Sequence, residues 1–154
     1  MTYPNLFDPT ESAKMIARIQ QLTPSAQAHW GTMDVAQMLA HCVVPYAYEF
    51  EPEKYGPPST GLKQIMMRLF LKGVIAGPKP YKKNSPTAPD FKIADTRDFE
   101  IEKSKLVDYI ARVQKLGAEH FEQKMTQSIG KLSADEWNSM FYKHLDHHLQ
   151  QFGV

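Results

Sequence analysis

The sequence predicts an all-α fold, a bundle of helices in a single domain covering residues 1–154, and three observations support this prediction. Apolar residues recur every three or four positions in several segments, which is the period of an amphipathic helix. Some of these segments begin at a capping residue, and several stop at glycine or proline. Alternating strand patterns and internal repeats of roughly 20–50 residues are both absent from the sequence.

The first predicted helix covers about residues 9–22. Asp8 is placed as its N-cap, Pro9 occupies the first helical position, and Glu11 can bond back to the cap. Its apolar face is expected to consist of Ala13, Ile16, Ala17, Ile19 and Leu22. The dipeptide Thr23-Pro24 then ends the helix.

A second helical pattern starts at Thr32, with Asp34 in its first turn, and continues to Tyr48. His41 lies on its apolar face. Pro45 cannot donate a hydrogen bond to the carbonyl of His41, so we expect a kink at that level.

The middle of the chain is rich in proline and glycine. Residues 52–61 are expected to lack regular structure, and a shorter helix follows at about residues 61–75. Residues 77–98 carry four prolines and show no period. A loop of this length in a compact domain is usually functional or wraps the surface.

Two helical patterns complete the chain. One runs from Phe99 to Gly117, a C-cap candidate, and residues 120–129 after it form a strand-like or irregular return. The last helix starts at Ser133, which makes the capping-box pattern with Glu136.

Composition excludes several classes of function. The 18 basic and 17 acidic residues leave a net charge of +1, so no global field attracts nucleic acid. The single cysteine, Cys42, rules out an intramolecular disulfide and fits a reducing compartment. No signal peptide and no apolar run of roughly 20 residues is present. We therefore expect a cytoplasmic protein without a membrane partner.

The last helix carries the residues with the clearest chemistry. His144 and His148 are four positions apart, so they lie one above the other on a helix face and can bind one metal ion. We hypothesise that His41 completes the site, because three imidazoles and a water make a tetrahedral catalytic zinc site. The alternative is that these are hydrogen-bonded core histidines.

The neighbours of these histidines can be placed on a helical wheel. Gln151 lies within about 20° of His144, and His147 lies about 60° to one side, so both are candidates to support a ligand or face a substrate. Asp146 points to the opposite side and is expected to be solvated. Leu145 stands where zinc proteases of the His-Glu-x-x-His type have their general base, which disfavours peptide hydrolysis.

Other chemically capable residues have plainer interpretations. Cys42 is expected to be a buried structural thiol, and His29 and His120 surface or capping residues. The lysines of the proline-rich loop either meet an anionic substrate or keep the loop solvated, and the second role is favoured; they are Lys79, Lys82 and Lys83.

Three motifs together resemble the DinB/YfiT-like superfamily, in particular an uncharacterised branch of it. They are Trp30-Gly31-Thr32-Met33, Gln37-Met38-Leu39-Ala40-His41 and the terminal run from His144 to Gly153. The resemblance implies a four-helix bundle with a long crossover, on which the 61–75 segment is an extra short helix. It also implies His41, His144 and His148 as metal ligands. Many relatives have Arg-Gly-Gln after the His-His pair, whereas this chain has Leu149-Gln150-Gln151.

The resemblance also implies an activity. Members of that superfamily with a known function are transferases or isomerases that use bacillithiol, mycothiol or related thiols, with a divalent ion such as zinc, nickel or iron. A metal-dependent thiol S-transferase acting on a small molecule is therefore expected, because metal coordination favours the nucleophilic thiolate. The alternative is a non-catalytic metal-binding or stress-response bundle. Homodimerisation through the first helix or the 61–75 helix stays open.

Overall fold

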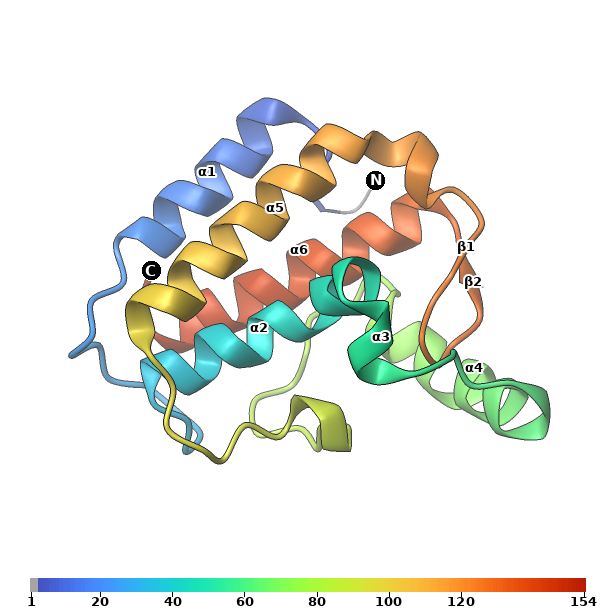
Figure 1. The fold of residues 1–154 in the computed structure, drawn as a ribbon, viewed down its shortest axis with the longest axis horizontal. Coiled ribbons are helices and arrows are strands. Elements are labelled where there is room, and N and C mark those ends of the chain that lie inside the picture. Colours follow the sequence, from blue (N-terminus) through green and yellow to red (C-terminus); the bar gives the residue numbers. More distant parts are fainter. Residues whose placement is uncertain (1–2) are drawn as a thin grey trace.

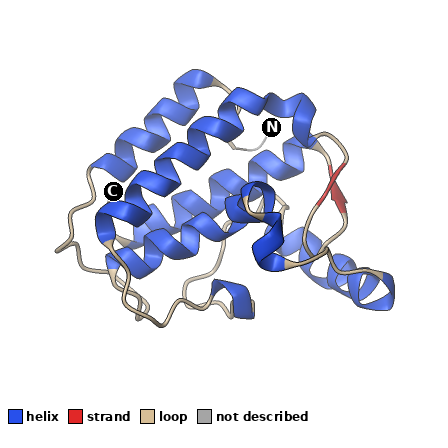
Figure 2. Cartoon of the chain, viewed as in Figure 1, coloured by secondary structure: helices blue, strands red, loops and turns tan. Residues whose placement is uncertain are grey.

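The computed structural model describes residues 3–154 and shows a mostly helical chain with one very short sheet (Figure 2). The prediction of a helical fold is confirmed. Four long helices dominate the described part: α1 (Pro9–Gln20), α2 (Val35–Phe50), α5 (Phe99–Phe121) and α6 (Ala134–Gln151). Shorter elements are α3 (Pro52–Tyr55), α4 (Gly61–Ile75), the 3-10 helix η1 (Pro89–Phe91), and strands β1 (Lys124–Met125) and β2 (Lys131–Leu132).

The four long helices pack side by side around one core (Figure 1). α2 and α5 are neighbours that run in the same direction, whereas α1 and α6 run the opposite way. Two parallel neighbours cannot be joined by a tight turn, so a long connection, residues 51–98, links α2 to α5. This connection carries α3, α4 and η1, and α4 lies outside the four long helices (Figure 1).

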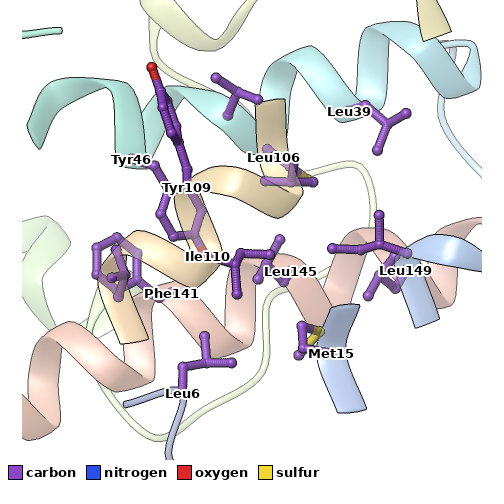
Figure 3. Packing of buried hydrophobic residues seen from close by; sticks show 14 of the residues in the cluster. Leu6, Met15, Leu39, Tyr46, Leu106, Tyr109, Ile110, Phe141, Leu145 and Leu149 are labelled. Carbon is purple, nitrogen blue, oxygen red and sulfur yellow. The ribbon is translucent and has the colours of Figure 1, made fainter. Parts of the chain in front are cut away.

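The core is formed where all four long helices meet (Figure 3). α2 is buried almost all round, since its residues from Val35 to Ala47 are buried except Gln37. Phe141, Leu145 and Leu149 of α6 are at most 1% exposed, so successive turns of that helix face the core. Our prediction of the α1 face is partly wrong: Met15 and Ile19 are buried, whereas Ala13 and Ala17 are exposed.

Side-chain caps fix where the helices begin. Asp8 accepts hydrogen bonds from the backbone of Thr10 and Glu11, and Ser133 and Glu136 form the predicted capping box. Asp34 is an N-cap rather than a first-turn residue, so α2 begins at Val35 and not at Thr32. The cause is a second capping box, in which the side chain of Gln37 bonds back to Asp34. α2 continues through Pro45 to Phe50.

Two connections hold structure that the sequence analysis did not predict. Pro52 starts the four-residue helix α3, as proline can at a first helical position. Gly117 adopts a positive φ of 74°, yet the chain resumes a helical path and α5 extends to Phe121. The strand-like return is the hairpin of β1 and β2, in which Lys124 pairs with Leu132 and Met125 with Lys131.

No helix within residues 3–154 combines the length and the apolar character needed to cross a bilayer.

Candidate metal centre

Three histidines meet between α2 and α6. His41 lies in the middle of α2, and His144 and His148 occupy successive turns of α6. One ring nitrogen of each lies within 4.8 Å of the others, and the Nε2 atoms of His41 and His144 are 2.9 Å apart. The three side chains are only 5–8% exposed. The fold thus brings together the residues that the sequence analysis named as ligands, although His41 and His144 are 103 positions apart.

The connection between α2 and α5 orients His41. The backbone carbonyl oxygen of Phe91, in η1, lies 2.8 Å from Nδ1 of His41. A carbonyl only accepts hydrogen bonds, so Nδ1 carries the proton and Nε2 keeps its lone pair. That lone pair is on the atom that faces His144.

Gln151 orients His148 in the same way. Its amide nitrogen donates to the carbonyl oxygen of Trp30 at 2.6 Å, which leaves the amide oxygen 2.8 Å from Nδ1 of His148. Nδ1 of His148 therefore donates, and its Nε2 is also free to bind a cation. Such outer partners fix the tautomer and ring orientation of metal-binding histidines.

Gly31 makes the contact with Gln151 possible. Its φ of +82° suits glycine, and a Cβ atom at this position would lie 2.7 Å from the amide nitrogen of Gln151. Because the backbone amide of His29 also donates to the carbonyl of Gln151 at 2.8 Å, the segment before α2 is tied to the end of α6. The motif Trp30-Gly31 thus supports the histidine cluster from outside.

Burial keeps the cluster uncharged. It lowers the pKa of His148 to about 3 and holds the pKa values of His41 and His144 below their ordinary range, and the nearby imidazole of His147 lowers all three further. Neutral imidazole is the form that binds metals.

The arrangement fits a divalent metal ion. At metal–nitrogen distances of about 2.0–2.1 Å, nitrogens in a tetrahedral site lie roughly 3.4 Å apart, between the 2.9 Å and 4.8 Å found here. Nδ1 of His144 is buried and has no hydrogen-bond partner among residues 3–154, so that ring is not held by a competing bond at this atom. Three imidazoles suit zinc, copper, iron and nickel better than magnesium or calcium.

Aromatic side chains of the connection cover the cluster. The ring centre of Phe91 lies 5.3 Å from that of His41 and 5.8 Å from that of His144, and Tyr81 approaches His144 at 6.3 Å. Neither residue was predicted from the sequence to belong to the site. Phe91 bonds through its backbone carbonyl, which no residue pattern marks, and Tyr81 stands alone in a segment without a period.

His147 lies beside the cluster. It is half-buried, and its ring meets Trp30 and Tyr81 edge-on at 5.7 Å and 5.8 Å between ring centres. The ammonium group of Lys83 lies over the ring of Trp30, with Nζ 4.1 Å from the ring centre. These four side chains border the histidine cluster on the side of the connection.

The remaining candidates lie elsewhere. Asp146 is not simply solvated, because its carboxylate pairs with Arg18 of α1 at 2.8 Å. Cys42 is buried in the core, as expected, with its thiol 3.7 Å from the sulfur of Met38. His120 is exposed and bonds to Glu49 at 2.8 Å.

Comparison with protein families adds one finding. A family model described as a protein of unknown function, DUF1569, matches residues 4–153. The chain belongs to the DUF1569 family. Neither the curated proteins nor the solved structures contain a match to it. The matched DUF1569 region includes all three histidines of the cluster together with Trp30 and Gln151.

Proposed function

We propose that this protein is a divalent-metal-dependent enzyme that acts on a small molecule, with a low-molecular-weight thiol as cosubstrate. One observation carries the proposal: two imidazoles present unprotonated Nε2 atoms because Phe91 and Gln151 accept the protons of their Nδ1 atoms, and a third imidazole joins them. The resemblance to the DinB/YfiT-like superfamily supports it, since that superfamily takes one ligand from its second helix and two from its last.

Different residues would bind the ion and orient its ligands. His41, His144 and His148 would hold the ion, and Gln151 would keep His148 in the required tautomer. A bound divalent ion would lower the pKa of a coordinated thiol and so supply a thiolate at neutral pH. The described residues place no carboxylate in the histidine cluster, which favours nucleophile activation over hydrolysis by a general base.

The substrate would enter beside His147. Trp30 and Tyr81 offer aromatic surface there, and the ammonium group of Lys83 next to Trp30 would attract an acidic group of a small molecule. Under this proposal, Lys83 has this role in addition to keeping the loop solvated.

Metal content tests the proposed site. We expect protein purified without a tag or chelator to carry about one zinc, nickel or iron ion per chain, measured by plasma mass spectrometry. The His144→Ala variant should lose the ion while keeping its helical circular dichroism. His147→Ala is the matched control and should retain the ion, because His147 stands next to the cluster without belonging to it. An ion retained in full by His144→Ala would contradict the assignment.

Thiol binding tests the proposed chemistry. The visible spectrum of the cobalt-substituted protein should change when 2-mercaptoethanol is added, because a thiolate that reaches the ion gives a charge-transfer band. The same addition to His147→Ala reports on access, since that change opens the border of the cluster. A cobalt spectrum indifferent to thiols at millimolar concentration would count against a thiol cosubstrate.

The burial of the site favours a second candidate, a non-catalytic protein in which the metal is structural. Phe91 and Tyr81 cover histidines that are at most 8% exposed. If the ion only joins α2 to α6, its removal by EDTA should lower the thermal midpoint strongly, because structural metal binding is folding free energy. A small change in midpoint together with thiol binding would favour the enzyme.

A further inference from the structure

Helix α4 presents an apolar face that no described side chain covers. Among the residues whose side chains the structure describes, ten large hydrophobic ones are exposed, and seven of these belong to α4. They are Leu62, Ile65, Met66, Leu69, Phe70, Leu71 and Val74, and Leu62, Leu69 and Phe70 are 68–74% exposed. α1, the other helix considered for a dimer contact, contributes none of the ten.

The exposed residues form one stripe. At about 100° per residue, all of them except Leu71 fall within roughly half of the helix circumference, with Leu62, Met66 and Gly73 nearest the centre. No described atom lies within 4 Å of a Cβ placed on Gly73, so bare backbone is open to a neighbouring helix there. We call these six residues and Gly73 the α4 stripe.

The opposite side of α4 is fastened to the rest of the protein. The buried ammonium group of Lys143 donates to the carbonyls of Val74 and Gly77 at 2.7 Å and 2.8 Å, and Lys72 pairs with Glu136 at 2.7 Å. These contacts tie α4 to α6 and fix which side faces outward. The α4 stripe is therefore held away from the core, on the helix that lies outside the four long ones (Figure 1).

We propose that the α4 stripe is a homodimer interface, in which α4 of one protomer packs against α4 of a second copy about a two-fold axis. Six half- to three-quarters-exposed large side chains offer on the order of 600–800 Å² in all, which approaches the roughly 800 Å² that each partner contributes to a standard interface. Apolar patches of this size are rare on monomers. A two-fold axis lets one face serve both partners.

The area of the α4 stripe, rather than its charge, selects a second copy as the partner. α4 carries three basic residues, Lys63, Arg68 and Lys72. Arg68 and Lys72 line a hollow together with Glu136, and Glu136 pairs with Lys72 at 2.7 Å. α4 also contains no acidic residue, so no unpaired carboxylate is buried at its own interface.

Sedimentation equilibrium over roughly 5–200 µM protein tests the proposal, since association follows mass action. We expect wild type to form dimers, and Leu69→Glu to raise the dimer dissociation constant by at least about tenfold, because each interface would bury two unpaired carboxylates within the α4 stripe. Phe70→Glu provides a second, independent variant. Ile101→Glu is the matched control: Ile101 is 65% exposed, against 71% for Leu69, but lies on α5.

The possible outcomes distinguish a homodimer from a monomer and from a helix that binds a membrane. A wild type that stays monomeric to 200 µM overturns it, and so does a dimer that Leu69→Glu and Phe70→Glu leave unchanged. If monomeric wild type floats with vesicles of phosphatidylcholine and phosphatidylglycerol, the α4 stripe binds a membrane and not a second copy, and the proposal is overturned. Both variants should keep the metal content of wild type, so a failed dimer prediction leaves the proposed function unaffected.

Discussion

Gln151 is bound on both sides of its amide group. The nitrogen meets the carbonyl of Trp30 and the oxygen meets Nδ1 of His148, so one side chain connects the segment before α2 to the candidate metal centre. Because it is 3% exposed, water cannot readily replace either bond. Its role in the cluster is to hold an imidazole still.

Replacing Gln151 tests that role. Gln151→Leu keeps the size of the side chain and removes both bonds, so we expect metal affinity to fall roughly 10- to 100-fold, as for other outer partners of metal ligands. Competition with a chromophoric chelator measures the change. Gln150→Leu is the matched control, since Gln150 is exposed and its side-chain amide donates to Asp146, away from the histidine cluster. Equal affinities in the two variants would show that His148 does not need its partner.

The pattern of side chains in the sequence predicted only some of the groups that form the candidate metal centre. His144 and His148 share a helix face because of their spacing, and Gln151 follows on the same face, so local geometry was enough to group them. Asp146 was predicted to be solvated because a wheel says nothing about neighbouring helices, and Arg18 of α1 meets it. The carbonyl of Phe91 has no sequence signal because every residue carries one.

At the scale of the elements, Glu51 joins α2 to α5. It follows the last residue of α2, accepts from the hydroxyl of Tyr109 and pairs with Lys105 at 2.6 Å, both on α5. Burial alone would raise the pKa of Glu51, but these two bonds and the charge of Lys105 outweigh it and lower that pKa. The ionised form is therefore favoured by folding.

That preference predicts an acid-dependent stability. A carboxyl group with a lowered folded pKa stabilises the fold above its unfolded value, about 4.5, and the contribution is lost as pH falls through the folded pKa. We expect Glu51→Gln to lower the free energy of unfolding by about 1 kcal/mol at pH 7 and by almost nothing near pH 3. Urea denaturation at both pH values measures this. The exposed acid Glu53 offers a control, and an equal loss in Glu53→Gln would refute the effect.

The bounds of two helices agree with the prediction from the sequence. The 61–75 helix has the predicted bounds, and the capping box at Ser133 starts α6 as expected. Gly117 was predicted to end α5, and the backbone does leave the helical conformation there, with φ 74° and ψ 172°. The sequence did not predict the helical turn after this kink, which extends α5 to Phe121. Phe121 is fully buried against Phe7 and Trp137, contacts that only the folded chain provides.

At the scale of the whole molecule, periodicity identified the helices but could not predict their neighbours. It revealed one apolar side for each helix, whereas α2 turned out to be buried almost all round. That full burial is what places His41 opposite α6. The sequence could mark residues 77–98 as a long connection, but not that Tyr81 and Phe91 would return over the histidines, because this depends on where α5 starts relative to α2.

The carbonyl of Phe91 also bears on how long an ion would stay bound to the cluster. It belongs to a stretch, residues 82–98, whose side chains are mostly exposed, and such segments open locally far more often than the core unfolds. Each opening would release the ring of His41 while α2 and α6 stay packed. The lifetime of an ion on this protein would then be set by how often a short surface segment lifts, rather than by the strength of the bonds to three imidazoles.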